Sequence, residues 1–220
     1  PFGQAVLLVL IQVGGLGFMV FATMLMGLLG RKLSIRGRLL VRESMNGVTL
    51  SGLGRLAGLY LVLALGIELA GALVLSLRFV PLYGMRRGLW FAAFHAVSAF
   101  CNAGFDLFGG GRSLTGFSGD VLMNLTAIML VVVGGLGFST LGDMLKKRSF
   151  RRFRLHTKLV LVTYGSLMLG AALLVLALEW SNPATLGPLS FGDKLLAALF
   201  QSVTLRTAGF NTIDQAALRD

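Results

Sequence analysis

Charged residues are scarce in this sequence, and their scarcity excludes most soluble protein classes. Only 13% of the 220 residues are charged, whereas a soluble domain carries about 25%. The hydrophobic residues, 55% of the chain, fall in long runs without a one-faced period. Runs of about 20 apolar residues match the hydrocarbon thickness of a bilayer. We therefore expect an all-α membrane protein.

Cysteine and histidine are also nearly absent. The single cysteine, Cys101, excludes an internal disulfide. The two histidines lie far apart, and no carboxylates are paired at ligand spacing, so neither a catalytic nucleophile with its base nor a metal site can be assembled. The sequence therefore indicates a protein that is not an enzyme. We expect no signal peptide, because the apolar opening is too long for one, and we expect an internal piece of a longer protein.

Positive charge is concentrated in two segments, 31–55 and 146–158, which hold thirteen of the 20 lysines and arginines. The net charge of +11 could indicate nucleic acid binding, but no aromatic stacking pattern or reader motif accompanies it. Both segments lie between apolar runs, as the positive-inside rule expects of cytoplasmic loops. We therefore expect no nucleic acid partner, contact with membrane lipid, and a multi-pass protein of the plasma membrane.

Four segments are long and apolar enough to cross a membrane. Two shorter apolar stretches, 89–100 and 195–205, lie in the connections, and each is followed by glycine-containing sequence. They predict re-entrant helices, because irregular backbone at membrane depth is tolerated only beside protein or a water-filled path. The predicted spanning segments are 2–29, 56–77, 121–145 and 159–180.

The sequence contains an internal repeat. Residues 13–18 and 133–138 both read Val-Gly-Gly-Leu-Gly-Phe, and 94–98 corresponds to 200–204. Each of the latter two segments leads to an Ala-Gly-Phe motif, and the later copy is one residue shorter. The predicted unit is a spanning helix, a re-entrant helix with a glycine loop, and a second spanning helix; several such units can surround a pore. The expected divisions are the inner helix of a first unit with its basic loop (1–55), a complete second unit with its basic loop (56–158), and the outer helix and pore loop of a third unit (159–220).

The two Ala-Gly-Phe loops predict an ion-selectivity filter built from main-chain carbonyls. Carbonyl oxygens replace the hydration shell of K+, and glycine permits the backbone angles that this requires. The helix before each loop directs its partly negative C-terminal end at the cation. We expect Gly104 and Gly209 at the constriction, with ordinary turns as the alternative. The predicted filter residues are Asn102, Ala103, Gly104, Phe105, Thr207, Ala208, Gly209 and Phe210.

Four further residues are candidates, and three of them, Arg206, Glu68 and His95, each allow more than one role. Arg206 precedes the second loop, and we expect it to support the loop by pairing with a carboxylate such as Asp214; the alternative is an electrostatic brake on conduction. Glu68 lies in an apolar stretch, where an acid is a functional candidate by default, but bonding to a neighbouring helix or loop is favoured. His95 is expected to be a hydrogen-bonded helix residue instead of a proton relay or metal ligand. Cys101 is expected to be a packing residue.

The remaining candidates are two aspartates and the glycines of the repeated hexapeptide. Asp106 and Asp120 either draw cations toward the outer mouth or are simply solvated. A dinucleotide-binding fingerprint is excluded, because the glycine spacing is wrong and no strand precedes it. Close helix packing is the expected role of these glycines, with a bend near the pore as the alternative.

Four motifs together are similar to the Trk/Ktr/HKT family of cation transporters, and most similar to its Ktr-type membrane subunit. They are the two loop segments, 94–106 and 200–214, and the two Val-Gly-Gly-Leu-Gly-Phe segments, in that family's order. The resemblance implies a potassium-channel-like pore of four helix–pore-loop–helix units in one chain. By that comparison, this sequence lacks the first outer helix and pore loop, the third inner helix and the fourth unit.

The same resemblance implies potassium uptake across the cell membrane by a homodimer, gated by a cytosolic ring that binds adenine nucleotides. K+ is the implied transported ion, with no bound cofactor. Sodium or sodium-coupled transport is the alternative, because relatives with different ion preference differ at the first filter, which lies before residue 1. A non-conducting membrane scaffold is the alternative of another class. The basic segments 31–55 and 146–158 would contact the ring or anionic lipid.

Overall fold

The computed structural model describes residues 2–15 and 53–219, and helices are the only regular secondary structure within these ranges. The second half of the predicted span 2–29 and most of the basic segment 31–55 lie outside the described residues. Short 3-10 turns cover Thr115–Phe117, Phe150–Arg152 and Gln215–Ala217, and one π-helical turn covers Thr204–Ala208. The helices are α1 (Phe2–Gly15), α4 (Leu53–Tyr83), α5 (Met85–Phe100), α6 (Val121–Gly135), α7 (Phe138–Lys147), α8 (Leu155–Glu179) and α9 (Phe191–Val203).

Two of the described helices are long and apolar enough to cross a membrane. They are α4, over Gly58–Tyr83, and the whole of α8; α6 and α7 make a third candidate if they are counted together. Several leucines on each long helix are 58–63% exposed, which fits a lipid environment. The expectation of an all-α chain with membrane-length helices is confirmed for the described residues. Examples of these leucines are Leu69 and Leu73 on α4, and Leu173 and Leu174 on α8.

Helix α4 is longer than the predicted segment 56–77. It continues past the charged Arg78 and ends at Tyr83. Arg78 is half exposed and forms an ion pair with Asp120, directly before α6, so its charge does not interrupt the helix. This pair connects the end of one predicted span to the start of the next.

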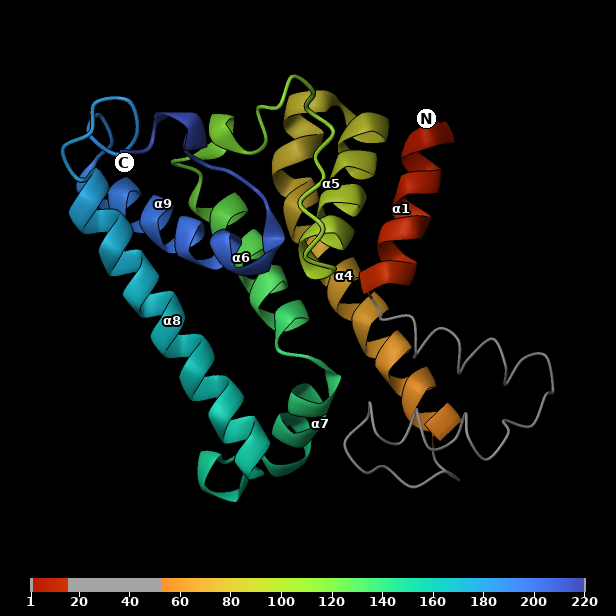
Figure 1. The fold of residues 1–220 in the computed structure, drawn as a ribbon. Coiled ribbons are helices and arrows are strands. Elements are labelled where there is room, and N and C mark those ends of the chain that lie inside the picture. The colour runs from red at the N-terminus through yellow and green to blue at the C-terminus, as the bar shows by residue number, and fades with distance from the viewer. Residues whose placement is uncertain (1, 16–52, 220) are drawn as a thin grey trace.

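Both short helices predicted before the glycine loops are present. Helix α5 begins four residues before the predicted 89–100 and ends at Phe100. Helix α9 begins four residues before the predicted 195–205, and the π-helical turn replaces its last two residues. With 16 and 13 residues, neither helix is long enough to cross a bilayer. Their C-terminal ends approach each other in the middle of the molecule (Figure 1).

The predicted span 121–145 is wrong as a single helix. It is divided into α6 and α7, whose axes differ by 99°. The break falls at Leu136 and Gly137, and Gly137 has a φ of +78°. Glycine adopts this left-handed conformation without strain. The bend that the sequence allowed as an alternative is therefore present.

Aromatic rings fill the space between α4, α5 and the chain that follows α5. Phe79 of α4 is fully buried, and its ring centroid lies 5.8–6.2 Å from those of Phe91, Phe108 and Phe117. Rings at these separations attract one another beyond the burial of their surface. The cluster holds the chain after the first glycine loop against α4. A smaller apolar cluster beside α9 contains Leu186, Ala197 and Ile213.

The basic connection between α7 and α8 lies at the opposite end of the molecule from the α4–α5 and α8–α9 connections (Figure 1). Asp143 of α7 holds it in place. The Lys147 ammonium lies 2.9 Å from the Asp143 carboxylate, and the Arg154 N–H donates to that carboxylate at 2.7 Å. Four further cations of this connection are exposed: Lys146, Arg148, Arg151 and Arg152.

Candidate functional site

The two Ala-Gly-Phe loops, far apart in the sequence, are in direct contact. A Cβ atom built on Gly104 would lie 2.2 Å from the Ala208 carbonyl oxygen, and one built on Gly209 would lie 3.6 Å from the Gly104 Cα. Both glycines have positive φ angles, +70° and +75°, which other residues adopt only with strain. Position 104 therefore requires glycine both for its backbone conformation and for its close contact with the second loop. Position 209 requires glycine for its backbone conformation alone.

A hydroxyl residue at equivalent positions of the repeat bonds each loop to its own helix. The Ser98 hydroxyl donates to the Phe105 carbonyl at 2.8 Å, and the Thr204 hydroxyl donates to the Phe210 carbonyl at 2.6 Å. The carbonyl of the phenylalanine that follows each glycine thus accepts a hydrogen bond from within the protein. Both predicted filter phenylalanines are in the loops as expected, but their carbonyls face back toward α5 and α9.

The first residues of the two predicted filters bond to each other. The Thr207 hydroxyl donates to the Asn102 side-chain oxygen at 2.8 Å, and the Asn102 side-chain amide donates to the Phe100 carbonyl at 3.1 Å. Asn102 has a φ of +54°, which asparagine tolerates better than most residues. The loops are therefore joined by side chains as well as by backbone contact.

Three glycines of the repeated hexapeptide lie in close contact with residues at or just after the C-terminal ends of the short helices. A Cβ on Gly134 would lie 1.8 Å from the Phe100 carbonyl oxygen, and one on Gly15 would lie 2.3 Å from the Cys101 Cβ. A Cβ on Gly135 would lie 3.1 Å from an Arg206 nitrogen. Close packing through small residues, predicted for the glycines of both hexapeptide copies, is confirmed at these three positions. The same contacts confirm Cys101 as a packing residue. The packing prediction is wrong for Gly14 and Gly137, where an added Cβ would meet no atom within 4 Å, and Gly17 lies outside the described residues.

The predicted ion pair between Arg206 and Asp214 is wrong. The Arg206 guanidinium carbon lies 3.3 Å from the centroid of the Tyr164 ring in α8, a cation–π contact. The Asp214 carboxylate instead accepts from the Ala216 N–H at 3.0 Å and caps a short turn. Arg206 has no carboxylate partner among the described residues. Its charge is stabilised by an aromatic face, which charge counting does not reveal.

Glu68 of α4 connects α1 to the end of α5. It bonds a neighbouring helix, which is the role favoured from the sequence. It is buried in α4, and the Gln12 side-chain amide of α1 donates to both of its carboxylate oxygens, at 2.9 and 3.0 Å. The Cys101 sulfur lies 3.7 Å from the same carboxylate. His95 is likewise a hydrogen-bonded helix residue, because its Nδ1 lies 2.7 Å from the Phe91 carbonyl oxygen, the geometry of a donated bond.

The two aspartates considered for cation attraction are both engaged locally. Asp106 accepts from the Phe108 N–H at 2.9 Å. Asp120 accepts from the Met123 N–H at 3.1 Å, in addition to its ion pair with Arg78. These bonds fix the chain on either side of the connection between the first loop and α6.

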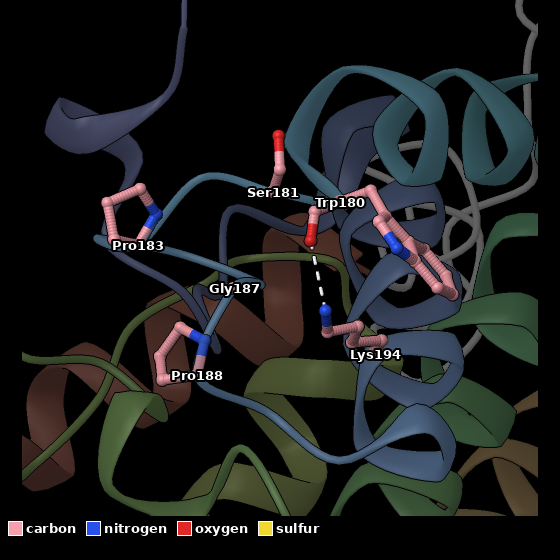
Figure 2. A pocket seen from close by; sticks show the side chains of 6 residues that line it. All are labelled: Trp180, Ser181, Pro183, Gly187, Pro188 and Lys194. Carbon is pink, nitrogen blue, oxygen red and sulfur yellow. Dashed lines mark hydrogen bonds between the residues drawn. The ribbon is translucent and has the colours of Figure 1, made fainter.

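A hollow of about 460 Å³ lies at the α8–α9 connection (Figure 2). The Lys194 ammonium donates to the Trp180 carbonyl at 3.0 Å and lies 4.7 Å from the Trp180 ring centroid. Because its charged lining residue is itself a cation, the hollow does not fit a metal cation. Its lining is Trp180, Ser181, Pro183, Gly187, Pro188 and Lys194, with no residue of either loop.

Sequence reasoning missed three contributors to this site: Ser98, Thr204 and Tyr164. A signal existed for the first two, because both copies of the repeat carry a side-chain hydroxyl at the same position of the short helix. No comparable signal pointed to Tyr164, because its partner Arg206 lies in a different predicted element.

The whole chain, residues 1–220, matches the family TrkH, described as "Cation transport protein". It is 48% identical to the "Ktr system potassium uptake protein B" of Bacillus subtilis, with 100% of this chain and 49% of the relative covered. It is 39% identical to the protein of the same name from Vibrio alginolyticus, covering 96% and 47%. Identity to "Potassium/sodium uptake protein NtpJ" of Enterococcus hirae is 38%, covering 96% and 46%.

The chain thus spans about half the length of these curated relatives. The family is one of transporters and not of enzymes, as the composition indicated. The match runs through both glycine loops and both copies of the repeated hexapeptide. This chain belongs to the TrkH family of cation transport proteins.

Proposed function

We propose that this chain forms part of a potassium-uptake pore in the plasma membrane, in which main-chain carbonyls of the two glycine loops coordinate the ion. One observation carries the proposal: the Gly104 loop and the Gly209 loop, from two copies of a repeat, meet backbone to backbone. The C-terminal ends of α5 and α9 lead into this contact, and helix C-termini carry partial negative charge that favours a cation.

The hydrogen bonds narrow the proposed ligand set. Because the Phe105 and Phe210 carbonyls accept from hydroxyls, the oxygens proposed to face the ion are those that precede them in each loop. These are the carbonyls of Asn102, Ala103 and Gly104, and of Thr207, Ala208 and Gly209. Two loops supply part of a ring, and the other walls belong to further helix–pore-loop–helix units of the longer protein.

Potassium is the proposed ion because two of the relatives are named as potassium uptake proteins. The potassium/sodium name of the Enterococcus hirae protein supports sodium as the second candidate. Carbonyl ligands suit both ions, and selectivity depends on how many oxygens surround the ion and how they are held. A non-conducting scaffold is the outcome to be excluded by measuring flux.

The test uses the full-length protein reconstituted in liposomes. We expect potassium flux that exceeds sodium flux, and Gly209→Ser should reduce the preference because a side chain at a left-handed position displaces the loop backbone. Gly192→Ser is the matched control, since a Cβ at that exposed helical position would meet no atom within 4 Å. Wild-type preference retained by Gly209→Ser would refute the filter, and absence of flux in the wild type would support the scaffold.

We also propose that the full-length protein is a homodimer regulated by a cytosolic nucleotide-binding ring. The exposed cations of the α7–α8 connection, Arg151 and Arg152 among them, form a surface suited to such a partner or to anionic lipid. Charge removal in Arg151→Gln/Arg152→Gln should weaken copurification of the ring subunit. Unchanged copurification together with reduced binding to anionic vesicles would identify lipid as the partner of this surface.

A further inference from the structure

We propose that Ser98 and Thr204 are positioning residues for ion selection: each hydroxyl holds the carbonyl of the phenylalanine that follows the loop glycine, Phe105 or Phe210, turned away from the ion. The inference rests on the proposed function of the loops. It concerns two side chains that do not touch the ion themselves. Both are buried, with 0% and 4% of their surfaces exposed, so their hydroxyls have no water to bond in place of the loop.

The same bond forms although the two loops follow different paths. In the first loop, α5 ends at Phe100 and the chain returns to Ser98 after seven residues. In the second, a π-helical turn extends α9 and the chain returns to Thr204 after six. If this hydrogen bond were only a by-product of loop geometry, it would be lost when the loop length and the end of the preceding helix change. Its presence in both copies indicates that the hydroxyl sets the position of the carbonyl.

Each hydroxyl residue holds its loop at two points. The Ser98 carbonyl accepts from the Ala103 N–H at 2.9 Å while its hydroxyl donates to Phe105. The Thr204 carbonyl accepts from the Gly209 N–H at 3.4 Å while its hydroxyl donates to Phe210. In the first loop the two bonds lie on either side of Gly104, and in the second Gly209 itself makes the backbone bond while the next residue accepts the side-chain bond.

The peptide group after Phe210 is fixed at both of its polar ends. Its oxygen accepts from Thr204, and its nitrogen, the Asn211 N–H, donates to the Ser113 hydroxyl at 2.9 Å. A peptide plane held at oxygen and nitrogen cannot rotate without breaking two hydrogen bonds. If the Thr204 hydroxyl is removed, the buried Phe210 oxygen loses its partner, and such groups are costly to leave unpaired.

Removing the hydroxyl should reduce the discrimination between potassium and sodium more than it reduces conduction. A freed carbonyl can turn toward the ion path, so the number and arrangement of oxygens around the ion become variable. Selectivity depends on that arrangement, whereas permeation requires only that some set of oxygens remains. Preference for potassium over sodium should therefore fall before total flux does.

The experiment compares Thr204→Val, Thr204→Ser and Ser202→Ala in full-length protein in liposomes, with flux normalised to folded protein. Valine keeps the shape and removes the hydroxyl; we expect the potassium-to-sodium ratio to fall about tenfold, the factor for one lost buried hydrogen bond. Thr204→Ser should restore the ratio. Ser202 is buried in α9, just before the π-helical turn, and among the described residues its hydroxyl bonds only the Leu199 carbonyl, so Ser202→Ala should leave the ratio unchanged.

A wild-type ratio in Thr204→Val, with potassium flux intact, would overturn the inference and leave the proposed function standing. No selective flux in the wild type would instead overturn the proposed function. If Thr204→Val is not recovered as folded protein, Ser98→Ala makes the same test at the first loop, where a fall in the ratio supports the inference and an unchanged ratio refutes it. Failure of Thr204→Ser to restore the ratio would also refute it, because the hydroxyl is then not the cause.

Discussion

Gly104→Ala tests whether backbone contact sets the distance between the two loops. The added Cβ would lie 2.2 Å from the Ala208 carbonyl oxygen and 3.0 Å from the Gly209 Cα. These obstructing atoms belong to the backbone, so the second loop would have to move as a whole. The left-handed φ of +70° costs a residue with a Cβ about 1–2 kcal/mol, and overpacking costs about 1–3 kcal/mol. We expect a total destabilisation of about 3 kcal/mol.

Gly209→Ala is the internal comparison for this experiment. Its φ of +75° is nearly the same, but the nearest atom to an added Cβ is 3.6 Å away, which is ordinary contact. It should therefore lose only the conformational part, about 1–2 kcal/mol. Denaturation midpoints of the full-length proteins in one detergent would rank the variants, and liposome flux would report potassium preference. Equal losses in the two variants would refute the close contact between the loops.

Three further predictions concern the surroundings of the loops, each measured by the denaturation midpoint. Tyr164→Leu should cost about 1–2 kcal/mol by removing the aromatic face under the Arg206 guanidinium, whereas Tyr164→Phe should be nearly neutral; a loss in the phenylalanine variant would contradict the cation–π contact. Glu179→Ala should cost about 2–4 kcal/mol, because the buried carboxylate accepts three hydrogen bonds from the α8–α9 connection and the chain near residue 219; a change below about 0.5 kcal/mol would contradict this. Gly137→Ala should cost about 1–2 kcal/mol by placing a Cβ at the left-handed bend, and Gly165→Ala, helical and without a neighbour within 4 Å, should not.

Much of the fold could be predicted because hydropathy reports directly on membrane-length helices. The predicted 159–180 corresponds to α8 within four residues at each end, since its apolar run is bounded by polar sequence on both sides. The break between α6 and α7 could not be located in this way. The apolar run continues through Leu136, and the bend depends on a backbone angle at Gly137 that hydropathy does not encode.

The repeat predicts the positions of the two loops, but it does not predict their side-chain contacts. Pairing Arg206 with Asp214 followed from opposite charge and short sequence separation, whereas the fold brings Tyr164 closer through helix α8. The Ser98 and Thr204 bonds required knowing that the chain turns back on its own helix after each glycine. Sequence shows which residues repeat, and only coordinates show which atoms those residues meet.

The two adjacent glycines of α6 have a consequence for how the loops are spaced. Gly134 meets the end of α5 and Gly135 meets Arg206 after α9. Consecutive positions of an α-helix point about 100° apart, so these two adjacent glycines contact the segments that lead into different loops. Helix α6 therefore separates the chain segments that lead into the two loops: a larger residue at Gly134 would push on the end of α5, and one at Gly135 would push on Arg206.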